Sequence, residues 1–388
     1  MTLITAGITI FALGSGIVFL YDFFVSVYEH FLHVAKKKWT SREQWEQAVY
    51  AVTKKWGQKC PTLRLKRERR YLLVDKVLGK SGKRMVQSWQ RAGCLLGLLE
   101  GQDGLADATV LKQEYFSADG NWKNAPDKVD YGMMAYVLLK ALPGQADQLR
   151  PSMDQMVSCI LRNRGADGTV SYSMGPDSPR RYVDTLGFVC PFLALYGTTY
   201  QQLEYIRLSV ELLEKYQVAG CFRDVPFHCY RVDSCEPLGV YAWGRGTGWY
   251  MLGLIDSFTV IPDSAEKKRL EALICQIGDR CLDFQMEDGG FASILPEKSR
   301  YDSSATAMIG YFYAKAGVCF GNSAYQVAAL RCEKRLMRAT NALGMVDNCQ
   351  GDTIDLGIFS DFYTFMPFAQ GMTLRLARCT AQFNSETI

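Results

Sequence analysis

The sequence predicts an all-α fold, in which one closed array of helical hairpins surrounds a central cleft and an N-terminal transmembrane helix precedes it. From Thr40 onward, about a dozen stretches place apolar residues at helical spacing, and convincing strand alternation is rare. Before them, an uncharged apolar run begins at Leu3. No Pro/Ser-rich linker divides the body, so we expect two parts: a membrane anchor with a basic juxtamembrane segment (1–39) and one helical domain (40–388).

The N-terminal run from Leu3 to Leu20 contains no charge and reaches the lower length limit for a spanning helix. A cleaved signal peptide is less favoured, because no Lys or Arg precedes the run and no A-x-A site follows it. A buried or interfacial helix is the other alternative, since Asp22 interrupts the apolar character. The basic residues that follow, Lys36, Lys37, Lys38 and Arg42, predict a cytoplasmic body by the positive-inside rule. Thirteen scattered cysteines without a CxxC pair agree with a reducing compartment.

The helices of the body can be followed in chain order. Thr40 with Glu43, or Ser41 with Gln44, forms a capping box that opens the first helix toward Trp56. Further helical stretches lie near residues 83–100, 104–116, 129–142, 148–163, 185–198, 201–217, 241–259, 264–286, 302–317, 323–341 and 364–381. The short run 169–172 is a candidate strand.

Three long connections stand between these helices, at residues 164–184, 219–243 and 287–302. They are rich in Gly, Pro, Asp and aromatic residues. Long loops inside a compact domain usually carry function, so we expect the functional site among them.

Composition excludes several classes of function. Forty-four basic and forty acidic residues give a net charge of +4, which is too balanced to indicate a nucleic-acid partner. Three histidines and scattered cysteines offer almost nothing for a zinc site, so no metal is expected. The sequence contains no G-x-S-x-G, HExxH or GxGxxG pattern. It therefore gives no support for a hydrolase with a nucleophile elbow, a zinc protease or a dinucleotide-binding protein.

Two aspartates stand where long loops enter apolar helices, Asp184 in Y-V-D-T-L-G-F and Asp130 in D-K-V-D-Y-G-M. An Asp at this position is a normal helix N-cap. Alternatively, two carboxylates that face each other across a cleft form the pair that acid/base chemistry needs. Sequence spacing does not decide between these readings.

A glycine-rich segment W-G-R-G-T-G-W occupies residues 243–249. Trp243 and Trp249 offer faces that stack on sugar rings, and Arg245 can grip a carboxylate with two hydrogen bonds. The alternative is a tight turn with packed aromatic residues. His228 is the lone histidine of the body and is either structural or a hydrogen-bonding partner in a cleft.

Together these segments resemble the unsaturated glucuronyl and rhamnogalacturonyl hydrolases, glycoside hydrolase families 88 and 105. The order matches over roughly residues 40–382: an Asp near a helix start, V-D-T-L followed by P-F-L, a histidine segment, W-G-R-G-T-G-W and S-S-A-T-A-M. The W-G-R-G-x-G-W and VDTL…PFL segments are the specific ones.

The resemblance implies an (α/α)6 barrel and the release of an unsaturated uronic acid by hydration of its vinyl ether, without a metal or organic cofactor. Asp184 resembles the catalytic acid/base and Asp130 its partner carboxylate. His228 resembles a histidine that contacts the unsaturated sugar. Trp243, Arg245 and Trp249 resemble the wall that binds the uronate ring. The implied partner is an acidic unsaturated oligosaccharide.

The sequence departs from the family pattern at three points. Tyr182 stands where a Trp is common, Asp302 stands where a Glu is common, and the first acid after His228 is as distant as Asp233. These departures put the choice of substrate in doubt more than the activity. Two competing functions remain: a membrane-tethered barrel that binds sugars without catalysis, and an ordinary glycosidase on the same barrel type.

Overall fold

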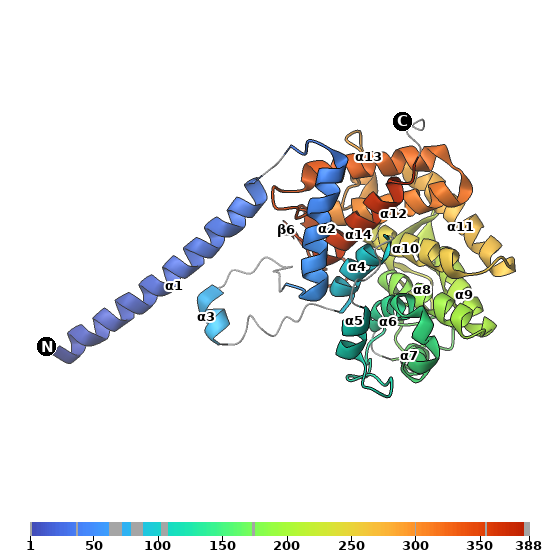
Figure 1. Cartoon of the computed structure of the whole chain (residues 1–388), viewed down its shortest axis with the longest axis horizontal. Helices are drawn as coiled ribbons and strands as arrows, with labels where there is room; N and C mark the ends of the chain where they lie inside the picture. Colours follow the sequence, from blue (N-terminus) through green and yellow to red (C-terminus); the bar gives the residue numbers. More distant parts are fainter. Residues whose placement is uncertain are drawn as a thin grey trace.

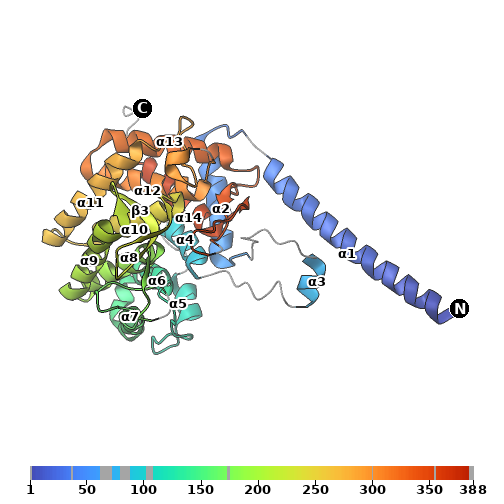
Figure 2. The same ribbon diagram turned by 180° about the vertical axis from the view of Figure 1, so that it is seen from behind.

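The computed structural model describes residues 2–35, 38–61, 72–78, 88–101, 108–172, 175–298, 300–353 and 355–383. Within these ranges the chain is mainly helical, and two concentric layers of helices form a barrel (Figures 1 and 2). This confirms the predicted all-α class. The start of the helix expected at 83–100 and that of the helix expected at 104–116 lie outside the described residues.

Six of the described helices form the inner layer, and each contacts its neighbours around the ring until the last packs on the first. They are α4 (Ser88–Leu99), α6 (Tyr131–Ala141), α8 (Asp184–Thr199), α10 (Gly244–Val260), α12 (Ser303–Phe320) and α14 (Pro367–Thr380). An outer helix precedes each of them in the chain. The outer helices are α2 (Arg42–Gln58), α5 (Ala108–Tyr115), α7 (Ala146–Leu161), α9 (Leu203–Gly220), α11 (Ala265–Leu282) and α13 (Ser323–Ala339).

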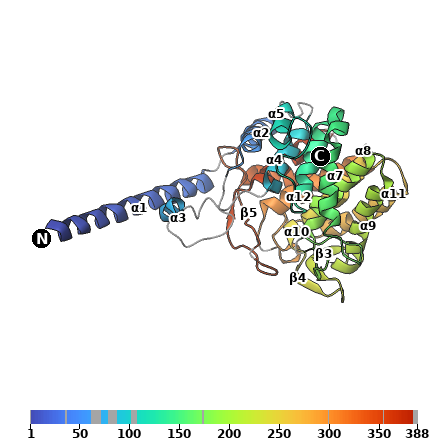
Figure 3. The same ribbon diagram turned by 90° about the horizontal axis from the view of Figure 1, so that it is seen from below.

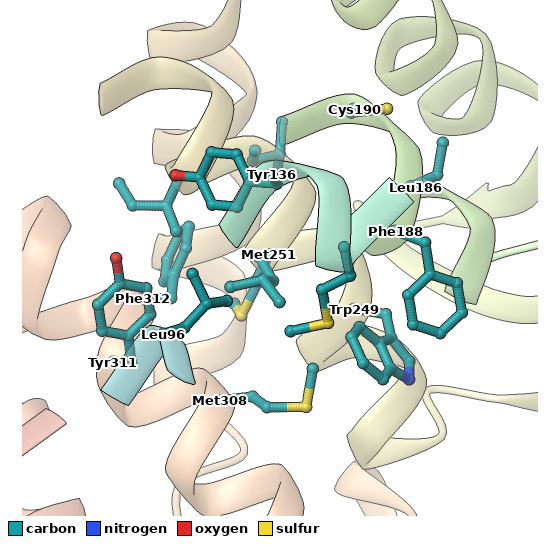
Figure 4. Packing of buried hydrophobic residues seen from close by; sticks show 14 of the residues in the cluster. Leu96, Tyr136, Leu186, Phe188, Cys190, Trp249, Met251, Met308, Tyr311 and Phe312 are labelled. Carbon is teal, nitrogen blue, oxygen red and sulfur yellow. The ribbon is translucent and has the colours of Figure 1, made fainter. Parts of the chain in front are cut away.

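Hydrophobic patterning separates the two layers. The inner helix α10 buries every residue from Gly244 to Phe258, whereas the outer helix α13 buries one face that includes Tyr325, Ala328 and Leu336. A helix that is apolar all round belongs inside, and an amphipathic helix covers it. Figure 4 shows the resulting interior, where side chains from several inner helices meet; Trp249, Phe188 and Met308 are among them.

The capping box that opens α2 uses Ser41, because its hydroxyl accepts a hydrogen bond from the Gln44 backbone N–H at 3.2 Å. Thr40 instead donates to the Gln44 side chain at 2.9 Å. The second of the two predicted alternatives is therefore the one that forms.

Because inner and outer helices alternate along the chain, all inner helices run in the same direction. Their C-terminal halves carry a buried ion cluster around Arg375, whose guanidinium bonds Asp256 at 2.8 and 2.9 Å and Glu100 at 3.0 Å. Lys315 also pairs with Glu100. Burial opposes ionisation of Glu100, but the charges of Arg375 and Lys315 outweigh it and lower its pKa to about 2.

The long loops contain short antiparallel strands. In one sheet, β3 (Val225–Arg231) pairs with β1 (Arg180–Tyr182), β2 (Cys221–Phe222) and β4 (Pro237–Tyr241), and a second sheet joins β5 (Cys349–Gln350) to β6 (Tyr363–Thr364). The prediction of a strand at 169–172 is wrong, because this segment makes a single isolated β-bridge, from Val170 to Arg164, and no strand. There the chain closes a tight turn on itself, with Gly165 N–H bonded to Thr169 C=O at 2.9 Å.

The N-terminal helix α1 (Thr2–Val34) projects away from the barrel (Figures 1 and 3). Among the described residues it is the one helix long and apolar enough to cross a membrane, and none of its most apolar stretch is buried. A membrane anchor and a signal sequence both fit a helix of this kind near the N-terminus.

The last turn of α1 packs on the barrel. The Asn341 amide donates to Leu32 C=O at 2.9 Å, and Ala342 N–H donates to Ala35 C=O at 2.7 Å. His33 Nδ1 lies 2.8 Å from a carboxylate oxygen of Asp347. Residues of the predicted 1–39 segment therefore contact residues of the predicted 40–388 segment.

Candidate active site

A cavity of about 310 Å³ opens at the end of the barrel where the inner helices begin. Residues from the starts of α4, α8 and α10 line it together with loop residues, so several distant chain segments converge there. The lining residues are Trp89, Tyr172, Tyr182, Asp184, Phe188, His228, Trp243, Arg245, Trp249, Asp352, Thr353, Asp355 and Leu356.

Asp184 and His228 form the polar centre of this cavity. The Asp184 Oδ2 atom lies 3.5 Å from His228 Nε2, and the two side chains are 19% and 5% exposed. Strand pairing brings them together, because Val183 N–H donates to His228 C=O at 3.0 Å. Asp184 is the first residue of α8, one position after the N-cap Val183. Its side chain lines the cavity beside His228.

His228 Nδ1 is buried and has no hydrogen-bond partner within the described part of the chain. The ring lies among aromatic side chains, with centroid distances of 5.5 Å to Tyr182, 4.8 Å to Trp243 and 5.4 Å to Phe359. A buried polar atom without a partner has a cost that a bound ligand can remove.

Asp130 lies behind Tyr172, outside the set of residues that line the cavity. It occupies the N-cap position of α6 but makes no side-chain capping bond. Burial raises the pKa of Asp130, and the positive charge of Lys128 and the nearby Tyr172 hydroxyl partly offset this. Burial also raises the pKa of Tyr172, as do the charges of Asp130, Asp184 and Asp352. The Tyr172 hydroxyl therefore lies among three carboxylates and connects Asp130 to the cavity.

Arg245 and Trp243 form one wall of the cavity. The Arg245 guanidinium stacks 5.0 Å from the centre of the Trp243 ring and donates to the backbone carbonyls of Gln350 and Gly351, the latter at 2.8 Å. Trp243 Nε1 donates to the Gln350 side chain at 2.9 Å. These bonds attach α10 to the hairpin that carries β5 and β6.

Trp249 is buried on the opposite, apolar part of the cavity. Its ring lies 5.6 Å from Trp89, 4.6 Å from Phe188 and 4.6 Å from Phe368, measured between centroids. These rings come from four inner helices, so the apolar wall is rigid. Aromatic faces of this kind are typical partners for the C–H surface of a sugar ring.

The structure thus brings five of the six residues singled out from the sequence to one cavity, and the sixth, Asp130, reaches it through Tyr172. Sequence reasoning missed Trp89, Tyr172 and the acidic residues Asp352 and Asp355. The last two follow β5 in the segment G-D-T-I-D-L-G, between helices expected to end near 341 and begin near 364. The length of that connection was the available signal.

Within the described residues, no group of three or more His, Cys, Asp or Glu side chains is placed to hold a metal ion. The cavity residues themselves are carboxylates, aromatic rings, one histidine and one arginine. This donor set suits an organic, polar ligand with apolar faces.

The model of Glycosyl Hydrolase Family 88 matches residues 105–374 of this chain. Similar solved structures include a possible member of glycoside hydrolase family 105 from Salmonella enterica serovar Paratyphi A, with a TM-score of 0.70 and 16% identity over 90% of this chain and 96% of that one. Another is the unsaturated glucuronyl hydrolase of Bacillus sp. GL1, with a TM-score of 0.62 and 16% identity over 87% and 96%. No curated protein matches at a significant level.

Proposed function

Because this chain belongs to Glycosyl Hydrolase Family 88 and is a glycoside hydrolase, we propose that it releases an unsaturated (Δ4,5) uronic acid from the non-reducing end of lyase-generated oligosaccharides. The observation that carries this proposal is the Asp184 carboxylate, which lines an aromatic cavity beside His228. The reaction is hydration of the C4=C5 vinyl ether.

In the proposed reaction the acid form of Asp184 donates its proton to C4, and positive charge develops at C5 and the ring oxygen. The resulting carboxylate accepts a proton from a water molecule as the water oxygen bonds to C5. The hemiketal then opens by breaking the bond from C5 to the ring oxygen, which leaves a ketone at C5 and a hemiacetal at C1. That hemiacetal releases the neighbouring sugar as an alcohol, so one water is consumed.

The other residues have supporting roles in this proposal. His228 lies close enough to orient the Asp184 carboxyl and to contact the sugar. Asp130 positions Tyr172. The Tyr172 hydroxyl lies near both Asp130 and Asp184 and connects the two carboxylates. Trp243 and Trp249 provide the surfaces against which the uronate ring stacks.

Arg245 supports an acidic substrate through its charge. It is 2% exposed and bonds to two carbonyl groups and, at 3.5 Å, to the Ser304 hydroxyl. Among the described residues, its link to a carboxylate runs through Ser304, which donates to Asp302 at 2.7 Å. A buried charge without a direct counter-ion favours an anionic ligand on the cavity wall.

The membrane role of α1 is a separate part of the proposal. Its exposed apolar side chains fit a lipid environment, and the basic residues that follow favour a cytoplasmic barrel. A membrane-impermeant maleimide tests this orientation at the exposed Cys235 and Cys319. We expect labelling in permeabilised cells and none in intact cells. Labelling in intact cells would show the opposite orientation.

The proposed activity can be tested with the full chain in detergent micelles and a panel of unsaturated rhamnogalacturonan and glycosaminoglycan disaccharides. We expect loss of the ultraviolet absorbance of the conjugated double bond for one sugar class, which identifies glucuronate or galacturonate. Asp184→Asn should abolish the loss without lowering the melting temperature. Asp263→Asn, at a fully exposed carboxylate, is the matched control. Release of the neighbouring sugar with the absorbance retained would instead indicate an ordinary glycosidase.

A further inference from the structure

The charges along the cavity wall are uneven. Three carboxylates line it, from Asp184, Asp352 and Asp355, whereas Arg245 is the permanent cation among the described lining residues. The proposed function, on which this inference rests, assigns Arg245 to the uronate carboxylate. Among the charged residues that the structure describes in the lining, a second anionic group on the substrate would then approach Asp184, Asp352 or Asp355.

The two acids Asp352 and Asp355 lie toward the mouth of the cavity. Asp184 is largely buried, Asp352 is half-buried and Asp355 is exposed, so the carboxylates form a series from the interior to the rim. An enzyme that removes the terminal sugar binds that sugar deepest and leaves the rest of the chain near the opening. The neighbouring sugar therefore passes the acids of the hairpin.

The hairpin that carries these acids is fixed to the barrel and does not hang free. Gln350 N–H donates to Asp302 at 3.1 Å, and Arg245 of α10 donates to Gly351 C=O at 2.8 Å. Leu356 also lies close to Gly239 of β4, so that a side chain added at Gly239 would contact it. The negative charges are consequently held in place beside the opening.

We propose that Asp352 and Asp355 are specificity-determining residues that exclude a sulfated sugar next to the unsaturated uronate. The substrate class is then an unsaturated uronic acid linked to a sugar without sulfate. Repulsion between like charges across a binding site is an effective way to reject a competing ligand. At a separation of about 10 Å and an effective dielectric constant of about 20, one such pair changes affinity by about tenfold.

Arg180 is the cation at the rim that argues for the opposite preference. It is exposed, bonds to the Tyr182 hydroxyl and lies within the field of Asp355. Because one partner is already the Tyr182 hydroxyl and the guanidinium is in water, its attraction for a sulfate is screened. The acids that line the cavity are expected to dominate.

The test compares sulfated and unsulfated unsaturated disaccharides that are otherwise identical, with the full chain in detergent. We expect kcat/KM to be about tenfold or more lower for the sulfated sugar, and the gap to narrow at high salt. Asp352→Asn and Asp355→Asn should each raise the ratio of kcat/KM for the sulfated sugar to kcat/KM for the unsulfated sugar. Asp361→Asn removes a charge from the same hairpin outside the lining set and should leave the ratio unchanged.

Several results would overturn the inference. Equal rates for both sugars, or a sulfate preference lost in Arg180→Gln, would contradict it while leaving the proposed function intact. A ratio unaffected by both Asn substitutions would also contradict it. Affinity of Asp184→Asn for each sugar gives a second measurement independent of turnover. Failure to consume any unsaturated disaccharide would overturn the proposed function, and the inference with it.

Discussion

At the scale of single residues, the position of two carboxylates decides how the site is interpreted. Asp130 and Asp184 both stand at helix starts, where a capping role was the simpler expectation from sequence. In the structure Asp130 is the N-cap of α6 but makes no side-chain capping hydrogen bond, and Asp184 is the first residue of α8, after the N-cap Val183. A sequence shows that an acid opens a helix, but it does not show where the side chain points. Tyr172 could not be selected for the same reason, because its role depends on side chains that it meets only in the fold, such as Tyr182 and Phe188.

The ionised carboxylate of Asp130 should lower the free energy of unfolding by a measurable amount. Burial raises its pKa above the ordinary value of about 3.9. As pH rises between the two pKa values, the unfolded chain releases this proton first, so the free energy of unfolding falls. We expect Asp130→Asn to raise the free energy of unfolding at pH 7 and to flatten its decline above pH 4.

Urea unfolding of both proteins between pH 4 and pH 7 measures this difference. The variant should also lose activity, because the amide holds Tyr172 differently. Asp130→Asn can fail this test in two ways: a lower free energy of unfolding than the parent at pH 7, or the same decline of that free energy with pH. Either result would contradict a raised pKa of Asp130 caused by burial.

Arg245 should act on substrate affinity. Removing a charge-assisted hydrogen bond costs about 1.5–3 kcal/mol, so Arg245→Ala should raise KM for an acidic disaccharide by about tenfold to hundredfold. Arg245→Lys keeps the charge but loses the planar fork that reaches Gln350 and Gly351, and should give an intermediate KM. Steady-state kinetics with a thermal melt of each variant separate binding from folding. An unchanged KM in folded Arg245→Ala would contradict the role.

At the scale of elements, the two ends of the inner helices have different roles. Their starts provide the cavity, and their C-terminal halves carry the ion cluster of Arg375, Asp256 and Glu100. Helix periodicity predicted most of these helices to within a few residues. The strands of residues 219–243 were not predicted, because strand pairing depends on partners that are remote in sequence.

The ion cluster should be important for stability. Asp256 is 1% exposed and holds both terminal nitrogens of Arg375. Breaking a buried pair leaves an uncompensated charge and typically costs about 3–5 kcal/mol. We therefore expect Asp256→Asn to lower the free energy of unfolding by about that amount. Asp283→Asn, at an exposed pair with Arg280, should change it by less than about 1 kcal/mol. Similar losses in both variants would show that the cluster has no special role.

At the scale of the whole molecule, the helical layers and the apolar N-terminal helix were predictable, whereas their junction was not. Hydropathy identifies an apolar helix but gives no information on what its last turn touches. In the structure that turn contacts Asn341, Ala342 and Asp347, close to the hairpin that lines the cavity (Figure 3). The end of α1 is therefore attached to the barrel by hydrogen bonds.

This junction predicts different stabilities for two truncated proteins. A chain that begins at residue 23 keeps Leu32, His33 and Ala35, whereas one that begins at residue 40 loses them. Each hydrogen bond contributes about 0.5–1.5 kcal/mol, and 1 kcal/mol shifts the melting temperature by about 1–2 °C in a protein of this length, because the shift falls as the chain lengthens. We expect the longer protein to melt several degrees higher in a thermal scan. Equal melting temperatures would show that the last turn of α1 adds nothing to the barrel.

The central claim is that Asp184 protonates C4 of an unsaturated uronate. The most direct measurement is turnover of an unsaturated disaccharide in D2O, followed by NMR of the released uronic acid. Vinyl-ether hydration predicts one deuterium at C4 and loss of the double bond, and neither in Asp184→Asn. Release of a uronic acid that keeps its double bond and carries no deuterium at C4 would contradict the account.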